Sequence, residues 1–108
     1  MGYARRVDVE PGAQLESRYR VTELLGRGGM GEVWRCRDLA RGCDVAIKMV
    51  RSDELGPDRR RLFYDEVMAT AHLDHPAIVR VLDVLQPGDD LALVMELRPG
   101  VPLRRVGR

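Results

Sequence analysis

The sequence predicts an α+β domain in which a five-stranded antiparallel sheet carries one main helix between its third and fourth strands. Short connections join the first three strands to one another and the last two to each other, which favours antiparallel neighbours. Apolar residues recur with a roughly helical period in residues 58–73. Apolar or alternating segments typical of strands occupy residues 19–25, 32–39, 44–50, 78–85 and 91–97.

Turn residues separate the first three strands. In residues 19–25, Tyr19, Val21, Glu23 and Leu25 alternate with Arg20, Thr22 and Leu24, which suggests a strand. The glycines of residues 26–31 exclude a helix interior in the segment that follows. Val, Trp and Cys in residues 33–36 favour a second strand, and residues 40–42 indicate a turn. Residues 45–47 and 49–50 are apolar, so we expect the third strand to be mostly buried.

Proline and glycine also mark the predicted helix and the last hairpin. Pro57 suits the first turn of a helix, and Asp58 follows at the positive end of its dipole. Pro76 ends the helix, because the residue before a proline disfavours helical geometry. A loop at residues 86–90 joins the last two strands. We expect residues 1–14 to be a flexible arm, residues 15–103 the domain, and residues 104–108 a basic tail.

Composition excludes several classes of protein. The chain has 108 residues, 44% hydrophobic and 32% charged, which is enough for one globular domain. A net charge of +1 argues against nucleic-acid binding. The longest apolar run, residues 91–95, falls far short of the roughly 20 residues of a membrane-spanning helix. Two cysteines are too few for a disulfide framework, no histidine is spaced as a metal ligand, and we expect a cytoplasmic protein.

The loop at residues 26–31 matches the pattern Gly-x-Gly-x-x-Gly, which alone is also compatible with an ordinary hairpin. A dinucleotide-binding loop would open a helix, but Val, Trp and Cys follow and Gly42 comes only eleven residues after Gly31. A Walker A loop is excluded because Lys48 does not follow a glycine. A third possibility is a hairpin folded over nucleotide phosphates, where glycine lets the backbone approach closely.

The neighbouring motifs favour this last possibility. Residues 31–33 read Gly-Glu-Val, and residues 45–48 read Val-Ala-Ile-Lys, the third-strand motif of protein kinases. Lys48 is the only lysine, beside 17 arginines. Over residues 15–103 the chain resembles the N-terminal lobe of a protein kinase, most closely the bacterial Ser/Thr kinases related to eukaryotic ones. Further matching segments are residues 19–21, 24–26, 28–33, 37–39 and 75–79.

This resemblance implies a role for each matching position. Leu25 and Val33 would cover the adenine and sugar, and Ala46 would line the adenine pocket. Lys48 would contact the α- and β-phosphates and be held by Glu66 of the helix. The hinge strand would place Met95 as gatekeeper, with the backbones of Glu96 and Arg98 as the adenine-binding edge. The phosphate loop would be Gly26, Arg27, Gly28, Gly29, Met30, Gly31 and Glu32.

Plainer interpretations compete with these roles. Val33, Ala46 and Met95 are apolar residues that a core also needs, and a helical glutamate such as Glu66 is commonly solvated. Glu66 shares a helix side with Leu62, Thr70 and Leu73, however, so it should face the sheet and require a cation. We therefore expect Lys48 and Glu66 to face each other.

The second half of a kinase active site is absent from these residues. The chain has no asparagine, no Asp-Phe-Gly and no His-Arg-Asp, which supply the magnesium ligands and the catalytic base of kinases. Two functions remain. The chain is an ATP-binding lobe of a Ser/Thr protein kinase that needs Mg²⁺ and a protein substrate only in the full-length enzyme, or a non-catalytic module that binds nucleotide or a partner.

Two structural expectations follow. If the second hairpin turns at Leu39 and Ala40, Cys36 and Cys43 lie directly opposite each other. Without a second lobe, the side chains of Val33, Ala46 and Met95 should face water, and the isolated lobe should be poorly stable or self-associate.

Overall fold

The computed structural model describes residues 8–28, 31–51, 58, 61, 65 and 77–100. Its strands form one antiparallel sheet in the order β1-β2-β3-β4-β6-β5, with six strands where we expected five. Strands β2 to β6 lie in the five predicted segments, and β2 runs further into the glycine segment than expected. The strands are β1 Gln14–Leu15, β2 Tyr19–Gly28, β3 Gly31–Asp38, β4 Cys43–Val50, β5 Ile78–Leu85 and β6 Leu91–Leu97.

The additional strand, β1, lies at the end of the segment that we expected to be a flexible arm. Leu15 pairs with Tyr19 and is buried. Just before it, the Gly12 N–H donates to the Val21 carbonyl at 2.8 Å, and the Val21 N–H donates to the Ala13 carbonyl at 2.9 Å. These bonds fix residues 12–15 to the edge of β2. The domain therefore begins before residue 15, inside the segment that we predicted to be a flexible arm.

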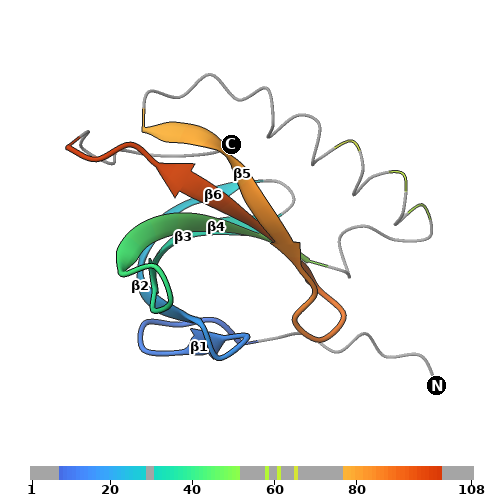
Figure 1. Cartoon of the computed structure of the whole chain (residues 1–108). Helices are drawn as coiled ribbons and strands as arrows, with labels where there is room; N and C mark the ends of the chain where they lie inside the picture. Colours follow the sequence, from blue (N-terminus) through green and yellow to red (C-terminus); the bar gives the residue numbers. More distant parts are fainter. Residues whose placement is uncertain are drawn as a thin grey trace.

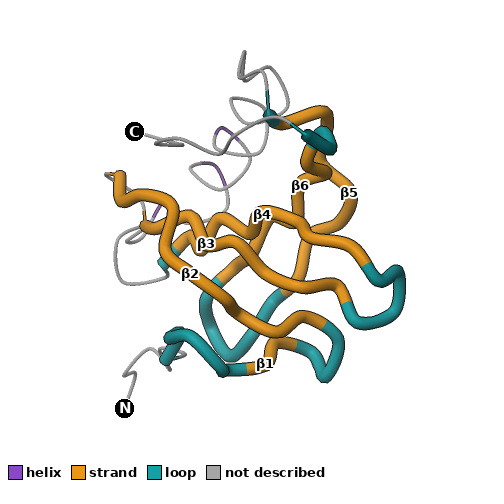
Figure 2. Tube along the Cα trace, turned by 90° about the vertical axis from the view of Figure 1, so that its left-hand side faces the viewer, coloured by secondary structure: helices purple, strands orange, loops and turns teal. Residues whose placement is uncertain are grey.

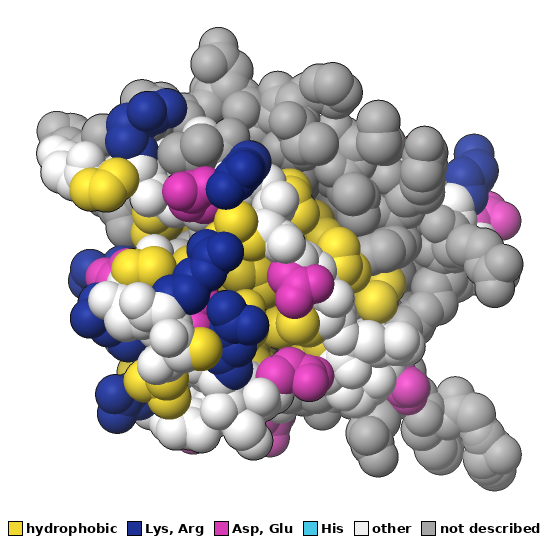
Figure 3. Space-filling model, viewed as in Figure 1, with side chains coloured by type: hydrophobic (Ala, Val, Ile, Leu, Met, Phe, Trp, Pro, Cys, Tyr) yellow, Lys and Arg dark blue, Asp and Glu magenta, His cyan; other side chains and the backbone are white. Residues whose placement is uncertain are grey.

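The sheet curls into a half-barrel around its main hydrophobic core (Figures 1 and 2). Leu15 of β1 and Leu82 of β5 pack in the same cluster, although their strands occupy opposite edges of the sheet. Figure 3 shows hydrophobic side chains in the hollow and basic side chains gathered on the side of the β3–β4 hairpin. The buried members of this inner cluster are Leu15, Tyr19, Val21, Trp34, Cys36, Val45, Ile47, Met49, Ala92 and Val94.

Strand β4 is buried on both faces, as its largely apolar sequence predicted. It lies between β3 and β6 and pairs with both. Val45, Ile47 and Met49 belong to the inner cluster. Ala46 belongs to a second, smaller cluster on the opposite, outer face, together with Val33, Ile78 and Met95. Because strand residues alternate between faces, Lys48 shares the outer face with Ala46.

The predicted helix at residues 58–73 falls mostly outside the described residues. Within this segment, Arg61 and Asp65 have helical backbone geometry. Arg61 also lies 3.6 Å from the carboxylate of Asp58, an exposed pair of little energetic weight. No helix among the described residues is long and apolar enough to cross a membrane.

A buried carboxylate organises the turn between β3 and β4. Arg18 holds Asp38 with two parallel hydrogen bonds, from Nε to Oδ1 at 2.9 Å and from Nη2 to Oδ2 at 3.0 Å. Oδ1 also accepts the backbone N–H groups of Ala40 and Arg41, at 3.0 and 3.1 Å. The hydrogen bond from Arg18, with those from the two backbone amides, lowers the pKa of Asp38.

This turn makes the predicted pairing of the cysteines wrong. Cys43 lies opposite Asp38, and Cys36 lies opposite Val45, because the turn takes residues 39–42 and not only Leu39 and Ala40. Gly42, with a φ of 72°, completes the wider turn and donates its N–H to the Asp38 carbonyl at 2.8 Å. Both cysteines are free; Cys43 is exposed, and burial raises the pKa of the Cys36 thiol to about 12.

Replacing Asp38 should destabilise the domain in a pH-dependent way. Asp38→Ala removes four charge-assisted hydrogen bonds and should lower the free energy of unfolding by roughly 2 kcal/mol at pH 7. Because folding lowers the pKa of Asp38, its contribution is fully present above the unfolded value of about 3.9 and is lost as pH falls through the folded value. Urea unfolding at pH 7 and pH 3 measures this loss. A variant whose deficit is equal at both pH values would contradict the account.

Candidate functional site

The glycine segment forms a hairpin between two antiparallel strands. Gly26 lies opposite Val33, and Gly28 lies opposite Gly31. These pairs are at the end of β2 and the beginning of β3, next to the turn that joins the two strands. A strand follows the loop directly, which rules out a loop that opens a helix and confirms the hairpin. Two predicted loop residues, Gly29 and Met30, lie outside the described residues.

Gly31 is required by the sheet itself. A Cβ atom at this position would lie 1.8 Å from the backbone carbonyl oxygen of Met49 on the neighbouring strand. The end of the hairpin therefore presses against the backbone of β4. Sequence reasoning assigned this glycine to phosphate approach alone, and the structure adds a packing requirement.

The apolar residues proposed to contact adenine share one face. Leu25 is the extra residue of a β-bulge between Leu24 and Gly26, and it packs against the outer cluster. That cluster also contains Val33, Ala46 and Met95. The last three are 3%, 0% and 1% exposed, so the expectation that they face water is wrong. Leu25, Val81 and Leu97, which pack against the same cluster, account for part of this burial.

Lys48 lies next to this cluster on the outer face of β4. Its neighbours across the sheet are Val33 on β3 and Leu93 on β6, both buried. Lys48 is itself half-buried, and this burial lowers the pKa of its ammonium group below the ordinary value for lysine. A positive charge is thus held beside an apolar surface, where an anion would find little competition from water.

The expected partner of Lys48, Glu66, lies outside the described residues. Arg27, on the strand leading into the loop, is exposed and lies opposite Glu32. Among the described residues there is no group of three or more His, Cys, Asp or Glu side chains able to hold a metal ion.

The two hinge positions both have partners within the chain. The Glu96 carboxylate accepts a hydrogen bond from Arg80 Nε at 2.8 Å. The backbone of Glu96 lies in β6, between β4 and β5. The Arg98 N–H donates to the Ala77 carbonyl at 2.8 Å. An adenine ring bound at this edge would therefore have to exchange that backbone bond for its own.

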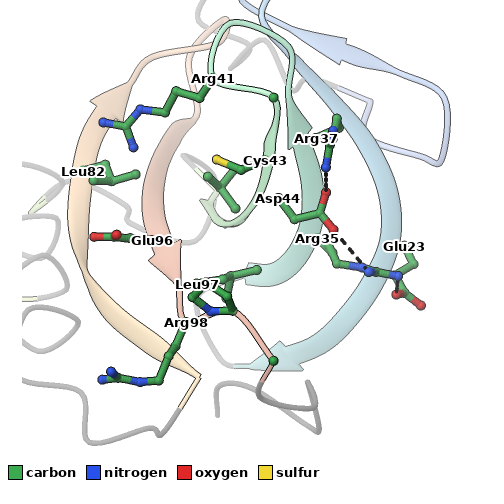
Figure 4. Close-up of a pocket in the computed structure, with 14 residues that line it drawn as sticks. Glu23, Arg35, Arg37, Arg41, Cys43, Asp44, Leu82, Glu96, Leu97 and Arg98 are labelled. Carbon is green, nitrogen blue, oxygen red and sulfur yellow. Dashed lines mark hydrogen bonds and ion pairs between the residues drawn. The ribbon is translucent and has the colours of Figure 1, made fainter.

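The hinge also borders an open pocket of about 690 Å³ next to the β3–β4 hairpin (Figure 4). Arg35 contacts Glu23 and lies 3.3 Å from Asp44, and Arg37 lies 3.2 Å from the same carboxylate. Figure 4 shows Arg41 extending from the hairpin toward the side of β5 that carries Leu82. The charges on the wall nearest β2 and β3 therefore pair with one another.

Sequence reasoning missed one charged cluster beside the glycine hairpin. Arg51, directly after β4, hydrogen-bonds Glu32 at 2.5 Å and Asp90 at 2.7 Å. Glu32 was assigned to the phosphate loop, but here its carboxylate turns to Arg51. No local pattern distinguishes Arg51 from the 16 other arginines, so only its position immediately after a buried strand could have pointed to it.

Together, the glycine hairpin, the outer apolar cluster and the half-buried lysine define the small lobe of a kinase-type protein. The protein kinase domain family matches residues 19–108, so the chain belongs to the protein kinase family. It corresponds to the N-terminal lobe of that domain.

Bacterial Ser/Thr kinases are among its relatives. The serine/threonine-protein kinase PkaB of Streptomyces coelicolor is 44% identical over 95 residues, which cover 84% of this chain and 22% of PkaB. PknA of Mycobacterium tuberculosis is 39% identical over 101 residues, covering 88% of this chain and 23% of PknA. The crystal structure of the M. tuberculosis PknI kinase domain matches with a TM-score of 0.60 and 28% identity, over 82% of this chain and 36% of that one. The chain thus spans less than a quarter of these two curated relatives.

The close approach at Gly31 is testable by substitution. Gly31→Ala should lower the free energy of unfolding by about 2 kcal/mol, because the new Cβ forces β3 away from the Met49 carbonyl. Gly42→Ala is the matched control, since Gly42 has a positive φ but nothing within 4 Å of its Cβ position. Thermal unfolding of both variants compares the two effects. If Gly31→Ala is no more destabilising than Gly42→Ala, the steric explanation fails.

Proposed function

We propose that this chain is the ATP-binding lobe of a Ser/Thr protein kinase, which transfers the γ-phosphate of ATP to protein Ser/Thr residues in the full-length enzyme. The observation that carries this proposal is the shared outer face of β4, where Ala46 and Lys48 lie next to each other beside the glycine hairpin. The apolar cluster would suit the adenine ring once the side chains that cover Val33, Ala46 and Met95 move aside, and the lysine suits the phosphates next to it.

Each residue has a defined part in this proposal. Leu25, Val33 and Ala46 cover adenine, Met95 is the gatekeeper, and Lys48 binds the α- and β-phosphates. The predicted helix at residues 58–73 would bring Glu66 to Lys48 and hold its ammonium group in place. The adenine edge would be the backbone of Glu96 and Arg98. Glycines 26, 28 and 31, with the intervening Arg27, Gly29 and Met30, would form the cover over the phosphates.

The remaining catalytic groups are not encoded in these 108 residues. Mg²⁺ would supply charge neutralisation at the phosphates, but the Asn and Asp-Phe-Gly motifs that hold it in kinases do not occur here. We therefore propose that the 108-residue chain alone binds ATP without transferring phosphate. A reducing, cytoplasmic location agrees with the two free cysteines.

A non-catalytic module that binds nucleotide or a partner is the second candidate. It would need only groups that these residues contain, namely the glycine hairpin, the outer apolar cluster and Lys48. The DNA downstream distinguishes the two candidates, since a reading frame with His-Arg-Asp and Asp-Phe-Gly supports the kinase.

ATP should raise the pKa of Lys48. The chain contains one lysine, so reductive ¹³C-methylation labels only Lys48 and the α-amino group, and NMR can follow each titration. Without ligand we expect a pKa below the ordinary value of about 10.4, because Lys48 is half-buried. Phosphates near the ammonium stabilise its charged form, so ATP should raise the pKa and adenosine should not. If ATP leaves the Lys48 titration unchanged, the lysine does not meet the phosphates.

The chain alone should show no phosphotransfer. Incubation with labelled ATP, Mg²⁺ and a general substrate protein should give the same background incorporation as the Lys48→Met variant, because no base or metal ligand is present to act on the γ-phosphate. Incorporation above the variant would mean that this chain contains catalytic groups that its motifs do not reveal.

A further inference from the structure

Three buried charged side chains meet at the end of the sheet that carries the glycine hairpin. Glu32, Arg51 and Asp90 are only 8%, 4% and 0% exposed. Arg51 Nη2 donates to Glu32 Oε1 at 2.5 Å, and Nη1 donates to Asp90 Oδ2 at 2.7 Å. A single guanidinium therefore bridges two carboxylates, and we call this group the charged triad.

The triad joins three neighbouring strands just where their pairing ends. Val50 lies opposite both Gly31 of β3 and Leu91 of β6. Arg51 and Asp90 are the next residues beyond that last pair. Glu32 lies opposite Met49, whose side chain points into the half-barrel, so the triad lies on the inner face and Lys48 on the outer one.

The triad is connected to the hairpin through the backbone. Glu32 directly follows Gly31, the last glycine of the loop, and Gly31 presses against the Met49 carbonyl. The glycines have no side chains with which to fix the hairpin. A side-chain anchor for its second strand must therefore come from a neighbouring residue, and Glu32 provides one by binding the buried Arg51.

The pairing of buried charges keeps the triad together. Buried charges are expensive unless they are paired, and removing one member leaves the others uncompensated. The two nitrogens of a planar guanidinium also fix the direction of both carboxylates, which the single point charge of a lysine would not do. Glu32 is consequently held in one place relative to β4, the strand that carries Lys48.

We propose that Arg51 is a positioning residue, which acts through Glu32 and Asp90 to hold the glycine hairpin at its working distance from the nucleotide phosphates. This inference rests on the proposed ATP-binding function. Arg51 lies on the face opposite Lys48 and needs no contact with the nucleotide. Its effect should therefore fall on the phosphates, under the hairpin, and not on the adenine, which the outer cluster covers.

The chain offers a matched control at the other end of β3. Arg18 pairs with Asp38, whose side chain is 1% exposed, much as Arg51 pairs with Asp90, whose side chain is 0% exposed. The Arg18 side chain is 40% exposed and that of Arg51 is 5% exposed, so the two pairs share the buried carboxylate and not the buried cation. Loss of either arginine leaves a buried carboxylate without its guanidinium, but only Arg51 lies beside the glycine hairpin. Comparing Arg51→Met with Arg18→Met thus separates hairpin positioning from general stability.

The first experiment measures binding of ATP and of adenosine to the whole chain by NMR titration, below the melting temperature of each variant. Arg51→Met should weaken ATP binding about tenfold and leave adenosine binding within about twofold, because only the phosphates lie under the displaced hairpin. Arg18→Met should leave the ratio of the two affinities unchanged. Equal losses for ATP and adenosine in Arg51→Met, or an ATP-specific loss in Arg18→Met, would overturn the proposal.

The second experiment does not depend on nucleotide. Amide hydrogen exchange of residues 26–33 should become faster in Arg51→Met and remain unchanged in Arg18→Met. Glu32→Gln, which removes one charge at nearly constant volume, should show the same change if Arg51→Met does not fold. Unchanged exchange in the hairpin would refute positioning by Arg51. If the unmodified chain binds neither ATP nor adenosine, the proposed function fails, while this measurement still decides the role of the triad.

Discussion

The burial of β4 on both faces is the constraint on which the rest of the structure depends. Val45, Ile47 and Met49 pack into the half-barrel, while Ala46 packs into the outer cluster. Because interiors are packed as densely as crystals, the strand has little freedom to slide or rotate. Lys48 lies between these residues on β4, so the packing of the core also fixes the position of its backbone. The candidate site and the core share one strand.

Buried carboxylates held by arginine anchor β3 at both of its ends. Asp38 at one end is bound by Arg18, and Glu32 at the other by Arg51. Each pair connects β3 to a different part of the chain, so the strand is tied to the segment before β2 and to the residue after β4. An eight-residue strand that contributes to both clusters is thereby fixed along its length as well as across the sheet.

Local patterns were sufficient wherever neighbouring residues decide the structure. The glycines of the loop and the apolar run of β4 predicted a hairpin and a buried strand, and both lie where expected. Predictions failed where particular hydrogen bonds, which no periodic pattern encodes, decide the structure. The register of the cysteines depended on how the Asp38 carboxylate and Gly42 build the turn, and β1 exists because residues 12–13 find hydrogen-bond partners on Val21.

The sequence by itself determined the antiparallel sheet, the hairpin and the strand position of Lys48, because these follow from side-chain alternation, from glycine geometry and from short connections. Only the tertiary structure decided which of the 17 arginines are structural. Arg51 and Asp90 are 39 residues apart in sequence, and Arg18 and Asp38 are 20 apart. An ion pair depends on the distance between two charges after folding, and no periodicity along the chain encodes that distance.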